Sequence, residues 1–398
     1  MGTVNLPSAK FTETELTRPV AANAFRVLAI GMVGWFHIWQ QTWQSAGSFT
    51  YLVRSGAAWV DGMIMLSAFC LFLPYANARA QGNPFSNIAP LDFYKKRAIR
   101  ILPSYYVSIL AAMVMTICWK GWQTLHWKDV AAHLTMTQAL FPESYLYSNL
   151  NGATWTLSIL VGFYLLFPLL AKAMVHAPIW TGAAMFALQA VWKWHIVPLY
   201  GTNDYTMRFN QMPAFASTLA LGMWGARLFA TAARSQWMQN WFCRTMCTVF
   251  GFGALWCVSR LLLQLNQAPE YQLWQLEYRT PLVFCMTMVL VLFSLGLPLP
   301  GVRVWSFLSM ISYNFYLWHQ MLVVWLKYAF HLPAWQGELP PNQMGDAAWS
   351  AKSNLFYWAA ALAAAVLMTW LVEKPFVKIY KKHSKKHNNN GKTPAKVV

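Results

Sequence analysis

The stretch AFRVLAIGMVGWFHIWQQTW, residues 24–43, decides the fold class of this chain. An α-helix of twenty residues is about 30 Å long, which matches the hydrocarbon core of a bilayer. Most of its side chains are apolar, and its ionisable side chains are Arg26 and His37. We therefore predict that this stretch crosses a membrane as one helix.

The rest of the chain repeats this pattern. Of its 398 residues, 57% are hydrophobic and 11% are charged, whereas a soluble domain has about 25% charged residues. Apolar stretches of spanning length occur near residues 24–43, 56–76, 101–119, 153–175, 179–199, 212–232, 245–264, 280–298, 305–327 and 353–372. The sequence predicts an all-α, polytopic integral membrane bundle of about ten transmembrane helices.

The formal net charge of +18 is distributed unevenly along the chain. Basic residues gather around 95–100, beside other predicted helix ends and in the tail, whereas the loops at 120–152, 199–211, 265–279 and 328–352 are less basic. An excess of Lys and Arg marks the cytoplasmic side of a membrane protein. We therefore predict that both termini are cytoplasmic, that the protein lies in the cell (inner or plasma) membrane, and that it binds no nucleic acid.

The composition divides the chain into three segments. We expect a cytoplasmic amino-terminal segment at 1–22, a transmembrane domain at 23–376, and a basic cytoplasmic tail at 377–398. The tail is polar and basic, which predicts disorder. The six cysteines lie mostly in apolar runs and lack zinc-like spacing, so we predict no metal site.

The first predicted helix carries a candidate functional pair. His37 follows Arg26 by eleven residues, which is about three turns, so both side chains share one helix face. Ionisable residues inside a membrane are energetically expensive and are functional candidates by default. His37 is either a general base or a polar contact between helices. Asp61, near the start of the second span, either orients His37 or caps a helix.

A basic cluster precedes the third span in FYKKRAIRILPSYY, residues 93–106. On a helix Arg97 and Arg100 point the same way, with Lys96 beside them. Paired guanidinium groups suit a phosphorylated ligand, because each can bind phosphate through two hydrogen bonds. The alternative is an ordinary cluster on the cytoplasmic side.

Polar side chains also interrupt the fourth and ninth spans. So many hydrogen-bonding groups at membrane depth indicate either a helix–helix contact or a polar cavity, and we favour a cavity shared with His37. The candidate cavity residues are Trp155, Ser158, Tyr313, Asn314, Tyr316 and His319.

These features occur in an order that resembles a known family. The spacing of Arg26 and His37 is similar to an R-x10-H feature, and it is followed by WVDGMIMLSAF (59–69), RAIRILPSYY (97–106), WTLSILVGFYLLFPLL (155–170), ISYNFYLWH (311–319) and VEKPF (372–376). Together they resemble the motifs of the acyltransferase-3 family of membrane O-acyltransferases, from Arg26 to Phe376.

The resemblance implies an activity and a set of partners. Family members transfer an acyl group, usually acetyl, from cytoplasmic acyl-CoA to a hydroxyl, often on an extracytoplasmic or lipid-linked sugar. Acyl-CoA would be a co-substrate, with no permanently bound cofactor, and the other partners would be a glycan or similar hydroxyl acceptor and membrane lipids. By resemblance, Arg97, Arg100 and Lys96 would bind the CoA phosphates. His37 would be the general base, supported by Arg26 and Asp61.

One departure from the family pattern bears on activity. Leu160 stands where the family pattern has Glu, and Leu can neither pair with an arginine nor accept a hydrogen bond. Either another acid such as Asp61 or Glu143 substitutes, or the chain has reduced or no activity.

Two other classes of function remain open. In a proton-coupled secondary transporter or exporter, His37 and Asp61 would relay protons. Transporters often contain internal repeats, and we find none in this sequence. In a non-catalytic family member, which Leu160 would favour, the chain would serve as a scaffold or binding module.

Overall fold

The computed structural model describes residues 11–85, 88–336, 339–341 and 345–389, and within these ranges the chain is helical and has no β-strand. The long helices are α2 (Val20–Thr42), α4 (Trp59–Ala80), α5 (Pro90–Lys120), α8 (Trp155–His176), α9 (Pro178–Ile196), α11 (Ala216–Ala232), α12 (Trp241–Gln267), α13 (Tyr271–Gly296), α14 (Val302–Tyr328), α15 (Ala347–Met368) and α16 (Lys374–Asn389). The short helices are α1 (Glu13–Thr17), α3 (Thr50–Arg54), α6 (Trp127–Leu134), α7 (Pro142–Tyr145) and α10 (Asn203–Phe209).

A helix lies over each of the ten predicted spans. In the described part of the chain, seven segments are long and apolar enough to cross a membrane, and they contain α2, α4, α5, α8, α12, α13 and α15. The helices α9, α11 and α14 complete the set of ten. α11 has only 17 residues, and α14 carries several buried polar side chains. The chain is therefore a polytopic helical membrane protein, as predicted.

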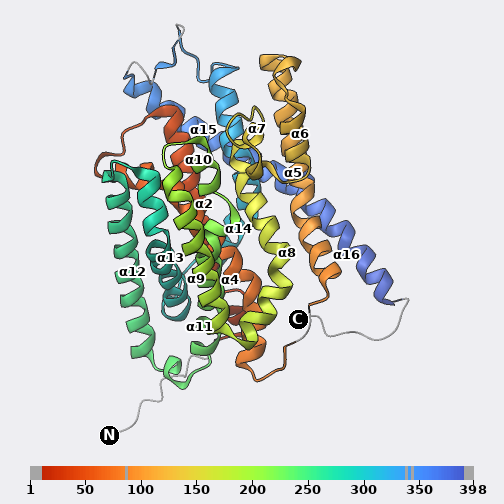
Figure 1. The fold of residues 1–398 in the computed structure, drawn as a ribbon, viewed down its shortest axis with the longest axis vertical. Helices are drawn as coiled ribbons and strands as arrows, with labels where there is room; N and C mark the ends of the chain where they lie inside the picture. Colours follow the sequence, from red (N-terminus) through yellow and green to blue (C-terminus); the bar gives the residue numbers. More distant parts are fainter. Residues whose placement is uncertain (1–10, 86–87, 337–338, 342–344, 390–398) are drawn as a thin grey trace.

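The helices α2, α4, α11 and α14 form the centre of the bundle, where α4 packs against α11 and α2 packs against α14. A glycine permits the first of these contacts. A Cβ atom on Gly222 would lie only 2.3 Å from the backbone oxygen of Met65 in α4. Small residues at such crossings let helices in a membrane approach closely. The pair α12–α13 lies at one edge of the bundle, and α5 lies at the other (Figure 1).

The carboxyl-terminal segment differs from our prediction. α15 continues through a π-helical turn, η10 (Thr369–Glu373), into α16, which projects from the side of the bundle (Figure 1). The predicted disordered tail, 377–398, is thus helical as far as Asn389. Extending an existing helix avoids the cost of nucleation, and Lys is a good helix former. Residues 390–398 lie outside the described residues, as do residues 1–10 of the amino-terminal segment.

Candidate active site

Two histidines from distant parts of the sequence meet in the membrane domain. The Nδ1 atom of His37 in α2 lies 2.8 Å from the Nε2 atom of His319 in α14. The other ring nitrogen of His319, Nδ1, lies 2.9 Å from the carbonyl oxygen of Tyr316 and 3.1 Å from that of Phe315. We refer to His37 and His319 together as the histidine pair.

The backbone contacts fix the tautomers of the neutral pair. A carbonyl oxygen only accepts, so Nδ1 of His319 carries the proton and donates it. Its Nε2 then accepts a hydrogen bond from Nδ1–H of His37. The proton of His37 is therefore on Nδ1, and its Nε2 atom has a free lone pair. A histidine in this state is ready to accept a proton from a substrate.

Close packing between α2 and α14 holds this geometry. A Cβ atom on Gly34 would lie 2.6 Å from the ring of Phe315, so only glycine fits there without a shift. Phe315 stacks on His319, with ring centroids 5.4 Å apart, and on Trp358 of α15. His319 is fully buried, whereas His37 is half-buried. Part of the His37 side chain thus remains exposed.

The predicted cavity residues lie in different places, and Tyr316 lies beside His319 of the histidine pair. The hydroxyl of Tyr316 hydrogen bonds with Thr156 of α8 and donates to the carbonyl oxygen of Ala153. The Tyr316 and His319 rings lie 6.0 Å apart. The structure therefore brings His37, Tyr316 and His319 together.

The other predicted cavity residues face elsewhere. Tyr313 donates to the carbonyl oxygen of Ile101 in α5, and the amide of Asn314 donates to Glu373 at 2.9 Å. Ser158 accepts a hydrogen bond from the backbone of Ala139 at 3.3 Å. Trp155 packs edge-on against Tyr145 and also contacts Phe215.

Three arginines gather at the end of the bundle where α2 begins. Arg26 donates to Ser309 at 2.9 Å and lies 3.5 Å from the sulfur of Cys70. Arg26, Arg97 and Arg100 all interact electrostatically with Tyr164 of α8. The Nε atom of Arg97 is buried without a hydrogen-bond partner, and Lys96 is exposed. We call Arg26, Arg97 and Arg100 the arginine cluster, and it presents guanidinium groups that are suited to phosphate.

Asp61 has neither of the two roles predicted for it. Its carboxylate pairs with Arg279 of α13, whose Nε lies 3.2 Å from Oδ2, and both side chains are almost fully buried. It therefore does not orient His37. It does not cap α4 either, because Ala58 holds that position without a side-chain hydrogen bond.

Sequence reasoning missed Arg279 because it placed this residue in a loop at 265–279. The helix α13 begins at Tyr271, nine residues before the predicted span, so Arg279 lies inside the bundle. Arg279 also donates to the carbonyl oxygens of Phe209 and Ala214. A buried charge requires such compensation.

Leu160 packs half-buried against the apolar cluster that contains Tyr105 and Tyr316. Neither proposed substitute acid lies there. Asp61 is paired with Arg279, and Glu143 forms an ion pair with Lys128 at 2.8 Å. The hydrogen bond from Lys128 lowers the pKa of Glu143. Glu373 is an acid that interacts electrostatically with Arg100 of the arginine cluster.

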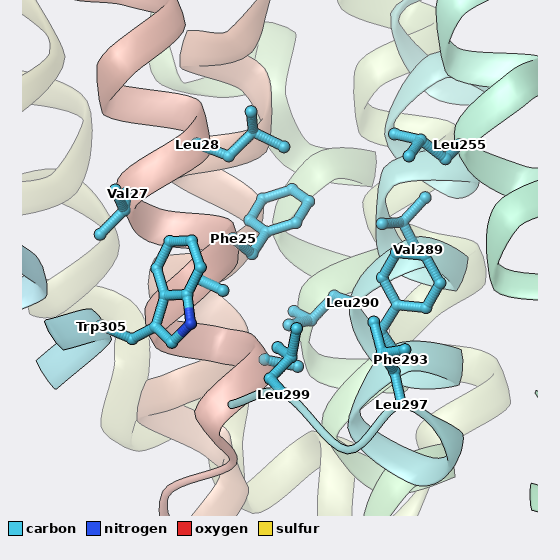
Figure 2. Close-up of a pocket in the computed structure, with 12 residues that line it drawn as sticks. Phe25, Val27, Leu28, Leu255, Val289, Leu290, Phe293, Leu297, Leu299 and Trp305 are labelled. Carbon is cyan, nitrogen blue, oxygen red and sulfur yellow. The ribbon is translucent and has the colours of Figure 1, made fainter. Parts of the chain in front are cut away.

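A separate apolar cavity of about 360 Å³ lies between α2, α12 and α13 (Figure 2). Its α2 wall includes Ala24 and Leu28, each about 200° around the helix axis from Arg26. The side chains that line it are apolar apart from the indole of Trp305, whose N–H donates to the Pro300 carbonyl. This cavity is on the side of α2 away from the histidine pair and supplies no group for proton transfer.

The comparisons with known proteins assign the chain to a family. A family model described as an acyltransferase domain matches residues 20–374, which is nearly the whole chain. No curated protein and no solved structure matches it. The matched range contains both the histidine pair and the arginine cluster. The chain thus belongs to the acyltransferase-3 family and is a multi-pass membrane acyltransferase.

Proposed function

We propose that the protein transfers an acyl group, preferentially acetyl, from cytoplasmic acyl-CoA to a hydroxyl of an extracytoplasmic or lipid-linked glycan. The observation that carries this proposal is the hydrogen bond between His37 and His319. It leaves Nε2 of His37 free to act as a base at mid-membrane depth. His37 lies in α2, and Arg26 lies near the amino-terminal end of the same helix.

In the proposed reaction, His37 Nε2 removes the proton from the acceptor hydroxyl while its oxygen attacks the thioester carbonyl. A tetrahedral intermediate forms and then collapses, and the carbon–sulfur bond breaks. The imidazolium of His37 returns the proton to the departing thiolate. The products are the acyl ester and free CoA, and His37 is regenerated. His319 does not touch the reactants and acts as a positioning residue that fixes the tautomer of His37.

The arginine cluster is the proposed site for the CoA phosphates. His37 lies eleven positions after Arg26, or about 16 Å along α2. A CoA molecule with its phosphates at the arginines would extend its thioester arm along this interval toward His37. The unpartnered Nε of Arg97 supports this assignment, because a buried donor without a partner is costly unless a ligand satisfies it.

Acetyl-CoA binding tests the proposal. We expect acetyl-CoA to raise the melting temperature of the purified protein in nanodiscs. The Arg97→Ala/Arg100→Ala variant should lose this shift, and Lys172→Ala, at an exposed lysine near the end of α8, should keep it. A shift that is unchanged by the double substitution would contradict the assignment. Proton-coupled transport by proteoliposomes with no response to acetyl-CoA would favour the transporter class instead.

A further inference from the structure

A polar pocket of about 240 Å³ lies at the opposite end of the bundle from the arginine cluster. Its walls come from the end of α5, the segment before α8 and the far half of α14, near α6 and α7 in the upper part of Figure 1. The lining residues that define its chemistry are Trp119, Lys120, Ser148, Asn149, Gln320 and Trp325. The membrane orientation that we predict from the distribution of basic residues places this end of the bundle outside the cytoplasm.

Hydrogen bonds hold the polar wall in place. Thr116 donates to the backbone oxygen of Asn149 at 2.7 Å, and the amide of Asn149 donates to the Thr124 carbonyl at 3.2 Å. Ser148 donates to Asp129 at 2.9 Å, and Asp129 in turn pairs with His133. The wall is therefore built by contacts among α5, α6 and the segment before α8, and does not depend on a ligand for its shape.

The lining combines two indole rings with amide and hydroxyl groups. Trp119 is 37% exposed and lies parallel to Tyr328, and the indole N–H of Trp325 donates to the backbone of Met115. Indoles offer flat apolar surfaces, and Asn149, Gln320 and Ser148 offer hydrogen-bonding groups around them. A sugar ring has the complementary character, since its C–H face is apolar and its edge carries hydroxyls. The volume suits a ligand of about that size.

The charge of the pocket narrows the class of ligand further. Among the described residues that line it, Lys120 is the one charged residue. Its Nζ donates to the neutral amide oxygen of Asn149 at 3.0 Å. The nearby acid Asp129 is buried behind Ser148 and paired with His133. The pocket thus presents a positive charge to its ligand, which favours an anionic group on that ligand.

Two residues that line the pocket are adjacent in sequence to residues at or beside the histidine pair. Gln320 directly follows His319 in α14. Gly152, which also lines the pocket, precedes Ala153, whose carbonyl accepts the Tyr316 hydroxyl bond. The segments that line the pocket therefore continue directly into residues that surround the histidine pair.

We propose that this pocket binds an anionic saccharide, one that bears a carboxylate or phosphate on the sugar ring, and that this saccharide is the acyl acceptor. The identification as acceptor rests on the proposed function, whereas the binding does not. The Lys120 ammonium contacts the anionic group, the indoles of Trp119 and Trp325 contact the ring, and Gln320 and Asn149 bind its hydroxyls.

Saturation-transfer NMR on the full-length protein in nanodiscs tests this proposal with three probes: methyl glucoside, methyl glucuronide and methyl glucoside 6-phosphate. We expect the two anionic probes to bind about tenfold more tightly than the neutral one, as for a hydrogen bond to a charged group. The stronger of the two anionic probes identifies the kind of anion. Lys120→Gln should reduce this preference to near unity, and Lys128→Gln, which changes an exposed lysine outside the pocket, should leave it intact.

Two outcomes would overturn the proposal. One is equal binding of the neutral and anionic probes to the wild type, and the other is an unchanged preference in Lys120→Gln. The His37→Ala variant separates this proposal from the proposed function, because it should bind the probes normally while losing acyl transfer. Normal probe binding without any acetyl-CoA-dependent transfer in the wild type would leave the pocket assigned and refute only its role as acceptor site.

Discussion

His37 and His319, which are 282 positions apart in the sequence, share one hydrogen bond of 2.8 Å between α2 and α14. Arg26 and Ser309 form a second contact between the same helices. Residue numbers rise together along both contacts, so α2 and α14 run parallel. Arg26 and the histidine pair are thus held at two levels of one helix pair.

The role of His319 as a positioning residue leads to a first prediction. His319→Ala should lower kcat by about 10²-fold, because His37 loses the acceptor that fixes its tautomer. His319→Gln should recover part of this loss, since a side-chain amide oxygen can accept the same hydrogen bond. Steady-state kinetics with acetyl-CoA would measure kcat for both variants. Equal rates for the Ala and Gln variants would show that the hydrogen bond between His37 and His319 does not contribute to the rate.

The contact between Gly34 and Phe315 leads to a second prediction. Gly34→Ala should destabilise the protein by about 1–3 kcal/mol, because the added methyl group forces α2 away from α14. Gly31→Ala is the matched control, since a Cβ atom there has no neighbour within 4 Å. Thermal unfolding in nanodiscs measures the difference. Similar melting temperatures for the two variants would be inconsistent with tight packing at Gly34.

The buried Asp61–Arg279 ion pair predicts a large interaction energy between these two side chains. Asp61→Asn should destabilise the fold by about 3–5 kcal/mol, because it leaves the Arg279 guanidinium buried without a countercharge. The double variant Asp61→Leu/Arg279→Met should recover much of this stability. Melting temperatures of the single and double variants form the test. An Asp61→Asn variant as stable as the wild type would contradict the pairing.

Leu160 gives a prediction about activity rather than stability. If the missing carboxylate limits this chain, Leu160→Glu should increase the rate of acetyl transfer. A carboxylate at this position would be able to pair with an arginine, which Leu cannot do. Leu160→Gln has nearly the same size without the charge and serves as the control. Rates from a free-thiol assay for CoA would decide the question. No gain in the Glu variant over Gln would remove the idea that Leu160 impairs the site.

Hydrophobic length predicted most of the fold but not the contacts of the site. The ten helices follow from apolar stretches, because the bilayer sets their length. The partner of Asp61 was not predictable in this way. The polar start of α13 hid the fact that Arg279 lies within a helix, and nothing local indicates a contact between residues 218 positions apart.

The histidine pair was partly predictable. The sequence placed His37, Tyr316 and His319 at membrane depth, but hydropathy assigns a residue to a helix without giving the rotation of that helix. For the same reason Asn314 was predicted to face His37, whereas it contacts Glu373, the last residue of the π-helical turn. Periodicity within α14 alone could not determine which of its faces meets α2.

The most direct test of the central claim is the initial rate of acceptor-dependent CoA release from acetyl-CoA by His37→Ala and wild-type protein in nanodiscs. General-base catalysis predicts a loss of about 10²- to 10⁴-fold in kcat, with acetyl-CoA binding unchanged. His195→Ala, at an exposed histidine, should retain the wild-type rate. A His37→Ala rate within about twofold of wild type would contradict the assignment of His37 as the base.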